Sequence, residues 1–149
     1  MEEYIIRETE DFFALSTLFH DSGMGVKIEE RKPDRIIKML RMDDPLTGEL
    51  MAAVTLEMRD GVFTLGDIAV RSDLRCRGYG KEMQTVVFRE AKRHGIRELW
   101  ACAKEPQYYS RNGWQRMDWD ESPRIAVYCD ACGKRSRDCH PEIMKYSLG

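Results

Sequence analysis

The chain has 149 residues, of which 42% are hydrophobic and 34% charged, a balance typical of one globular domain rather than of a disordered chain. Its 24 basic and 26 acidic side chains give a net charge of −2, so the overall charge offers no case for binding nucleic acid or a membrane surface. The acidic N-terminus and the lack of a long apolar run argue against a signal peptide or a membrane span. We therefore expect a cytoplasmic protein whose five cysteines are not structural disulfides.

The N-terminal segment predicts a strand followed by a helix. Residues 2–8 indicate a short strand. Thr9 can cap the helix that follows, which places Glu10 and Asp11 in the first turn, where the helix dipole favours acids. The apolar residues of this helix recur at helical spacing, namely Phe12, Leu15, Leu18 and Phe19.

The middle of the chain predicts strands. Residues 26–35 are polar and give no clear pattern, whereas residues 36–42 favour a strand. Two further apolar runs, 49–58 and 62–70, flank the pair Asp60-Gly61. An Asp-Gly pair between two apolar runs predicts a β-hairpin.

The second half of the chain predicts helices and strands in alternation. After Gly80, apolar residues recur on one helical face, and His94-Gly95 supplies a cation and a glycine at the helix end. Residues 96–103 indicate a buried strand, so strand, helix and strand follow one another as in a crossover between parallel strands. We expect three more elements: a short helix around residues 108–112 and final strands at 114–119 and 142–148.

The segment from Arg71 to Lys81 combines glycine backbone with positive charge. It holds four basic side chains and one acid, which gives a local charge of +3 in a chain whose net charge is −2. It lies between a predicted strand and a predicted helix, and the first amides of a helix have no partner within it. Such amides bind phosphate oxygens, and glycine lets a phosphate approach the backbone. We therefore predict a phosphate site; the alternative is a solvated basic loop with a glycine turn.

Sequence motifs exclude two common phosphate sites and resemble a third. Neither the P-loop pattern nor the dinucleotide-binding pattern occurs. The run D-I-A-V-R-S-D-L-R-C-R-G-Y-G-K resembles the acetyl-CoA site of the GNAT superfamily of N-acetyltransferases, in which Gln/Arg-x-x-Gly-x-Gly/Ala follows an apolar strand. About 30 residues later, the run from Tyr108 to Trp114, Y-Y-S-R-N-G-W, resembles the family's Phe/Tyr-Tyr-x-x-x-Gly-Phe segment.

This resemblance implies an α+β (α/β) structure with the acyl-CoA N-acyltransferase fold, whose central mixed, twisted sheet has about six or seven strands flanked by helices. The resemblance covers roughly residues 3–120 and the last strand. We expect a single domain over residues 1–149, with a cysteine-rich insert at about 121–141 that lies outside the resemblance.

The resemblance also implies how acetyl-CoA, the co-substrate, is bound. In the family, the backbone of the strand before the phosphate loop pairs with the pantetheine arm, and the loop holds the pyrophosphate. These functions fall on Ile68, Ala69, Val70, Arg75, Cys76, Arg77, Gly78, Tyr79, Gly80 and Lys81. An amine attacks the thioester directly, and Tyr109 matches the tyrosine that often protonates the leaving thiolate. The alternative is that Tyr109 is a core aromatic residue beside Trp114, although Tyr108 could be the packed one.

The attacking amine must lose a proton, and the family has no fixed base for this step. Asp67, on the strand just before Ile68, is the best-placed carboxylate. It could equally stabilise a strand bulge after Gly66 or bind a cationic substrate. Glu57 and Glu105 are weaker candidates.

The insert contains a second candidate site, because Cys-x-x-Cys-Gly has the form of a metal-binding turn. The predicted ligands of a structural zinc ion are Cys129, Cys132, Cys139 and either His140 or a residue from elsewhere. Redox-active thiols and incidental cysteines remain alternatives.

We expect an acetyl-CoA-dependent N-acetyltransferase that acts on the amine of a small molecule or a peptide. One alternative is a non-catalytic acyl-CoA sensor or adaptor, since no obvious glutamate base is present. A second is a zinc-ribbon-like module that contacts a macromolecule through residues 134–137, although short charge runs are usually solvated. The acidic pairs Glu29-Glu30 and Asp43-Asp44 could attract a cationic acceptor, and homodimers are frequent in the family.

Overall fold

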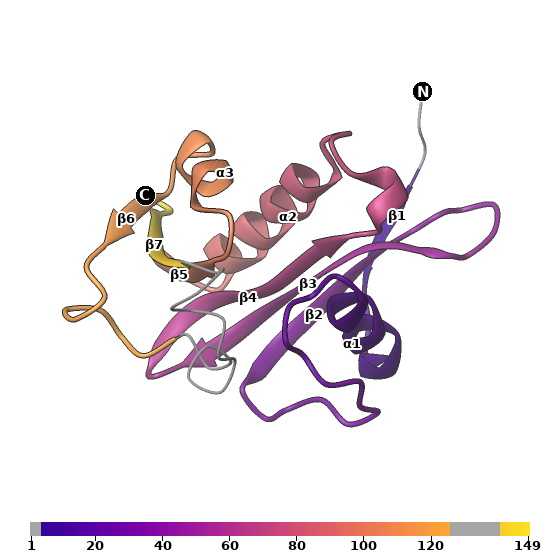
Figure 1. Cartoon of the computed structure of the whole chain (residues 1–149), viewed down its shortest axis with the longest axis horizontal. Coiled ribbons are helices and arrows are strands. Elements are labelled where there is room, and N and C mark those ends of the chain that lie inside the picture. The colour runs from indigo at the N-terminus through magenta and orange to yellow at the C-terminus, as the bar shows by residue number, and fades with distance from the viewer. Residues whose placement is uncertain (1–3, 126–140) are drawn as a thin grey trace.

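The computed structural model describes residues 4–125 and 141–149. In this part of the chain, seven strands form one mixed sheet in the order β1-β2-β3-β4-β5-β7-β6 (Figure 1). The strands are β1 (Ile5–Glu8), β2 (Ile36–Asp43), β3 (Leu50–Arg59), β4 (Val62–Val70), β5 (Glu98–Ala103), β6 (Gln115–Met117) and β7 (Glu142–Ser147). The helices are α1 (Phe12–Asp21), α2 (Tyr79–Arg93) and α3 (Pro106–Arg111). The predicted mixed sheet flanked by helices is confirmed.

Strands β1 to β4 form an antiparallel meander, and the predicted hairpin is its last turn. Asp60 and Gly61 both have left-handed backbone angles, with φ of 48° and 77°. Two left-handed residues in a row suit the twist of a hairpin, which explains why Asp-Gly occupies this turn. None of the helices in the described residues is long and apolar enough to cross a membrane.

The start of α1 differs from the prediction. Asp11, not Thr9, caps the helix, because its Oδ1 accepts a hydrogen bond of 3.1 Å from the amide of Ala14. The amide of Thr9 instead donates to the carbonyl of Met39, so this residue still belongs to the edge of the sheet. The hydroxyl of Thr9 accepts from the amide of Asp11 and orders the turn between strand and helix.

The helix near residue 108 also begins earlier than predicted. Pro106 occupies its first turn, where the missing amide proton of proline costs nothing. The helix ends at Arg111, before Gly113, as the sequence predicts.

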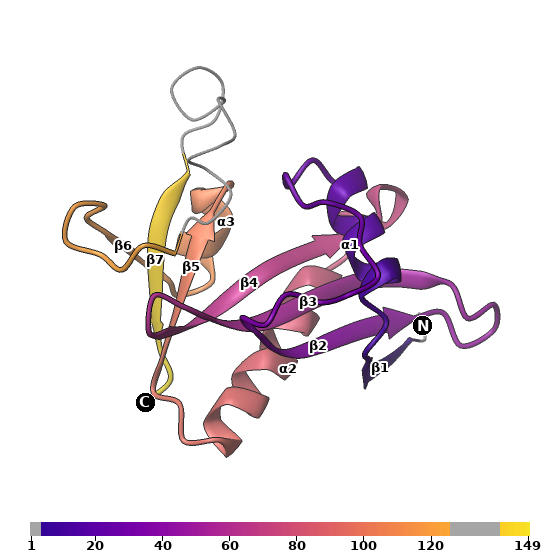
Figure 2. The same cartoon turned by 90° about the horizontal axis from the view of Figure 1, so that it is seen from below.

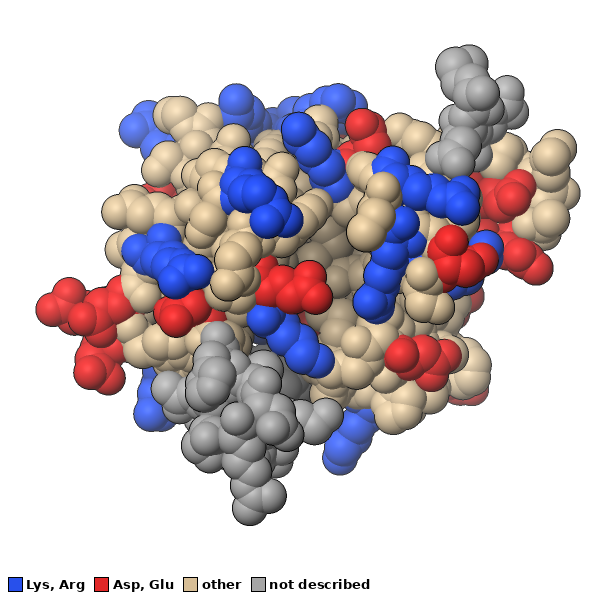
Figure 3. Space-filling view, turned by 45° about the horizontal axis from the view of Figure 1, so that its top comes forward, with Lys and Arg blue, Asp and Glu red and all other residues tan. Residues whose placement is uncertain are grey.

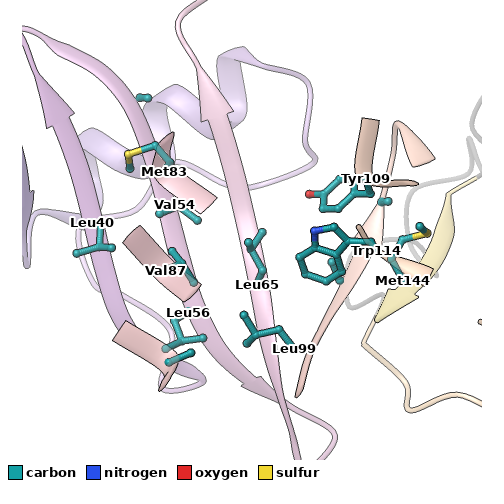
Figure 4. Packing of buried hydrophobic residues seen from close by; sticks show 14 of the residues in the cluster. Leu40, Val54, Leu56, Leu65, Met83, Val87, Leu99, Tyr109, Trp114 and Met144 are labelled. Carbon is teal, nitrogen blue, oxygen red and sulfur yellow. The ribbon is translucent and has the colours of Figure 1, made fainter. Parts of the chain in front are cut away.

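Two apolar clusters fill the space between the sheet and its helices. Helices α1 and α2 lie on opposite faces of the sheet, as Figure 2 shows. The cluster under α2 includes Met83, Val87 and Ala91, which lie on one side of that helix as the sequence pattern predicts. Figure 4 shows this cluster running on to Tyr109 and Trp114. The cluster under α1 includes Ala53 and Ala69 from the opposite face of β3 and β4.

The sheet opens between β4 and β5. Strand β4 pairs with β3 from Val62 to Val70, interrupted by a bulge. Its parallel pairing with β5 is limited, within the described residues, to Thr64 and Trp100. The edge of β4 that faces β5 is therefore unpaired from Ile68 to Val70, and its backbone groups are available to another partner.

Candidate functional site

The loop between β4 and α2 presents cations to solvent. A short 3₁₀ turn at Ser72–Leu74 begins it, and Arg71 is engaged there by Asp73, with Nε 2.7 Å from Oδ1. This ion pair accounts for one of the four basic residues that the sequence places in the loop. The other three, Arg75, Arg77 and Lys81, are exposed.

The backbone of the same loop turns sharply into the helix. Cys76 and Gly78 have left-handed φ angles of 65° and 87°, and α2 begins directly after Gly78, with no side chain that caps it. In the described structure, the amides of Gly78, Gly80 and Lys81 donate no hydrogen bond. Unpaired amides at the positive end of a 15-residue helix, next to three cations, are chemically suited to hold an anion such as phosphate.

The end of β4, the start of α2 and helix α3 meet beside this loop. A Cβ added at Gly80 would lie 3.1 Å from the hydroxyl oxygen of Tyr108 and 3.8 Å from Cγ2 of Val70. Gly80 therefore lets α3 approach the first turn of α2. Figure 3 shows this side of the molecule, where several Lys and Arg side chains and an acidic one lie around a hollow.

Tyr109 is buried next to the opening between β4 and β5. Its ring packs edge-on against Trp114 at 5.2 Å and against Tyr108 at 5.8 Å. Of the two tyrosines, Tyr109 is thus the buried one and Tyr108 is half-buried. Figure 4 shows the hydroxyl of Tyr109 directed toward β4. Packing against Trp114 fixes the ring of Tyr109 and does not involve its hydroxyl group.

The surroundings of Tyr109 keep its proton in place. Burial is the main cause that raises the pKa of Tyr109 above its usual value, and the nearby Tyr108, Asp67, Cys102 and Glu105 raise it further. The phenol is therefore neutral at physiological pH, the form that can donate a proton.

Asp67 lies at the bulge in β4 and is only 6% exposed. Burial, together with the negative charge of Glu57, raises the pKa of Asp67 to about 7, against the opposite effect of Arg59 and Arg35. A carboxyl group with this pKa exchanges protons readily near neutral pH, which suits a general base.

Sequence reasoning missed Thr55 and Arg59 beside Asp67 and named Glu57 only as a weaker candidate base. Thr55, Glu57 and Arg59 alternate along β3, so they share the face of the sheet opposite Val54 and Leu56. Glu57 is buried completely, and Arg59 is 4% exposed. The signal was present as two charges in an otherwise apolar strand, but the sequence did not show that they face Asp67.

The predicted zinc ligands, Cys129, Cys132, Cys139 and His140, lie outside the described residues. Within residues 4–125 and 141–149, no group of three or more His, Cys, Asp or Glu side chains could hold a metal ion. The zinc site stays a prediction from the sequence. Cys76 is an exposed free cysteine, and Cys102 is half-buried.

Comparisons with known proteins show the family and the fold of this chain. The family model described as the acetyltransferase (GNAT) family matches residues 4–119. A comparison with curated proteins yields no match.

Solved structures with the same fold include several bound to CoA. N-acetylglutamate synthase from Neisseria gonorrhoeae, with CoA and N-acetyl-glutamate, is similar at a TM-score of 0.73 and 19% identity over 100% of this chain. This chain covers only 36% of that enzyme. A Mycobacterium tuberculosis protein in complex with CoA has a TM-score of 0.72 at 15% identity, with 97% of this chain and 99% of that chain covered. The ribosomal-protein-S18-alanine N-acetyltransferase from Escherichia coli has a TM-score of 0.66 at 15% identity, covering 99% and 95%.

Proposed function

Because this chain belongs to the GNAT family of acetyltransferases, we propose that it transfers the acetyl group of acetyl-CoA to a primary amine by direct attack. The observation that carries this proposal is the opening between β4 and β5. An unpaired strand edge, an anion-binding loop and two proton-transfer groups, Asp67 and Tyr109, surround it.

The binding of acetyl-CoA follows from the order of these features along the chain. The backbone of Ile68–Val70 is the proposed partner of the pantetheine amides, because this edge of β4 has no strand beside it. The pyrophosphate is proposed to lie on the amides between Cys76 and Lys81, with Arg75 and Arg77 adding charge. The thioester then reaches the opening of the sheet, where Asp67 and Tyr109 are found.

The proposed reaction needs two proton transfers. Asp67, as its carboxylate, takes a proton from the neutral acceptor amine as its nitrogen attacks the thioester carbonyl. The C–N bond forms, the tetrahedral intermediate collapses, and the C–S bond breaks. The leaving CoA thiolate receives the proton of Tyr109, which later recovers one from solvent.

The acceptor is proposed to be the primary amine of a small molecule or of a peptide. The similar structures include an N-acetylglutamate synthase and a ribosomal-protein-S18-alanine N-acetyltransferase. The chain spans about a third of the glutamate enzyme, so that enzyme's activity does not transfer as a whole. An assay must therefore screen both amino acids and short peptides.

The test is release of CoA thiol from acetyl-CoA in the presence of a panel of amines. With the best acceptor, Tyr109→Phe is expected to lower kcat by about 10- to 100-fold, because it keeps the ring packing and removes the proton donor. Asp67→Asn is expected to lower kcat/KM by about 100-fold or more near neutral pH. Unchanged rates in both variants would contradict the assigned functions.

A non-catalytic acyl-CoA sensor is the competing function. It predicts binding of acetyl-CoA without thiol release for any amine in the panel. The presence of a carboxyl group whose pKa suits proton transfer near neutral pH, beside a phenol that keeps its proton, favours the enzyme.

A further inference from the structure

Glu57 lies at the centre of a buried polar network beside the site. Its carboxylate accepts hydrogen bonds from the Thr55 hydroxyl at 2.5 Å, from Arg59 Nε at 2.8 Å and from Arg35 Nε at 3.0 Å. Arg59 also donates from Nη1 to the carbonyl of Ile125 at 2.8 Å. A carboxylate with three such donors has a single orientation, because turning it would leave buried charges unsolvated.

This network contacts Asp67 at two points, its backbone amide and its carboxyl group. The amide of Asp67 donates to Oγ1 of Thr55 at 2.9 Å, and Oδ2 of Asp67 lies 3.9 Å from Nη2 of Arg59. Thr55, Glu57 and Arg59 therefore connect the backbone of Asp67 to its own carboxyl group. The closed ring spans the bulge of β4.

Gly66 makes room for this arrangement. A Cβ there would overlap the Glu57 carboxylate and the Thr55 hydroxyl. The bulge in β4, the absence of a side chain at Gly66 and the buried carboxylate of Glu57 therefore depend on one another. Glu57 itself has no exposed surface, so a substrate cannot reach it.

We propose that Glu57 is a positioning residue of the acetyl-transfer site, which acts through Thr55 and Arg59 to hold Asp67 at the opening between β4 and β5. This inference rests on the proposed function, since Asp67 is the base of that reaction. Glu57 contributes no proton and no contact to the acceptor.

The charge of Glu57 gives the inference a measurable consequence. The charged and titratable groups around Asp67 are Glu57 and Arg59 on β3, Arg35 before β2, and Tyr109 on α3. Glu57→Gln keeps the shape of the side chain and removes one of the two negative charges, while both guanidinium groups remain. The carboxyl group of Asp67 should then ionise at lower pH, because the repulsion that opposed its ionisation is gone.

The experiment is a carbon NMR titration of Asp67 in protein labelled at aspartate carboxyl groups, with Asp67→Asn to assign the signal. In Glu57→Gln, the midpoint is expected about half a pH unit or more below that of the wild type. The acidic limb of the kcat/KM profile should move with it. A titration that does not move in folded Glu57→Gln overturns the inference, whatever the activity.

A second pair of variants keeps the test open if Glu57→Gln does not fold. Thr55→Val removes the hydroxyl that joins Glu57 to the amide of Asp67, and Thr55→Ser retains it. Thr55→Val is expected to lower kcat about tenfold with the KM for acetyl-CoA unchanged, and Thr55→Ser to restore it. Equal activity in the two variants overturns the inference.

Failure of the proposed function looks different. The titration midpoint of Asp67 could shift in Glu57→Gln while Asp67→Asn retains full activity. Asp67 would then not be the base, and Glu57 would have no positioning function in catalysis. The structural link between Glu57 and Asp67 would stand in that case.

Discussion

Gly66 shows at the scale of one residue how the site constrains the sequence. Its backbone angle is not the left-handed one that favours glycine, so conformation alone would allow a side chain. The constraint is space, because the carboxylate of Glu57 and the hydroxyl of Thr55 occupy the position of a Cβ. A glycine of this kind cannot be explained from local sequence, since its neighbours belong to another strand.

Gly66→Ala is accordingly expected to lower the free energy of unfolding by about 1–3 kcal/mol, the usual cost of overpacking a buried site. Gly80→Ala is the matched control, since Gly80 also lacks a left-handed backbone and its added Cβ would lie 3.1 Å from the Tyr108 hydroxyl and 3.8 Å from Val70, with no overlap. It should change the free energy of unfolding by less than about 1 kcal/mol. Urea denaturation of both variants measures the difference, and equal stability would contradict the packing described for Gly66.

The raised pKa of Asp67 also makes stability depend on pH. The folded state holds the proton of this carboxyl up to a pKa of about 7, whereas the unfolded chain releases it near its usual value of 3.8. Between these values the folded state binds more protons, so this group's contribution to stability falls as pH rises and is constant above the folded pKa. Asp67→Asn should therefore gain stability relative to the wild type between pH 4 and pH 7. Thermal unfolding of both proteins across this pH range measures the difference. If stability changes with pH in the same way in both, Asp67 is not a buried group with a raised pKa.

At the scale of the elements, the sequence predicts the parts around the site better than their assembly. The Asp-Gly hairpin, the apolar face of α2 and the glycine loop before it are local patterns, and the structure contains all three elements. The position of Thr55 opposite the bulge depends on the register between β3 and β4, which no local pattern specifies. The cap of α1 fell on Asp11 for a similar reason, because pairing with Met39 keeps Thr9 in the sheet.

The open edge of β4 gives a prediction at this scale. Binding of acetyl-CoA should slow amide exchange in the segments Ile68–Val70 and Cys76–Lys81, because their backbone groups gain partners there. The first half of β4, Val62–Leu65, lies between β3 and β5, with which it pairs at Thr64, and should change little. Hydrogen–deuterium exchange with mass spectrometry compares these segments directly. Protection confined to other elements would place the ligand elsewhere.

Over the whole molecule, charge is distributed so that a nearly neutral chain holds a basic site. The net charge is −2, yet Arg75, Arg77 and Lys81 gather at the start of α2. The two sides of the opened sheet are also connected, since Nζ of Lys104, just after β5, donates to the carbonyl of Gly23 at 2.7 Å. This contact joins the loop after α1 to the far side of the opening. Its partners lie 81 positions apart, so the sequence alone gives no sign of it.

The binding of acetyl-CoA to the loop before α2 is the central claim, and titration calorimetry tests it most directly. The wild type should bind acetyl-CoA at micromolar levels, while Arg77→Glu and Gly78→Glu should bind at least about tenfold more weakly because each brings a carboxylate toward the phosphates. Arg116→Glu, the same charge change as Arg77→Glu at an exposed residue of β6, is the control and should bind as the wild type does. If the wild type fails to bind, or if all three folded variants bind equally well, the loop is not the phosphate site and the proposed function is wrong.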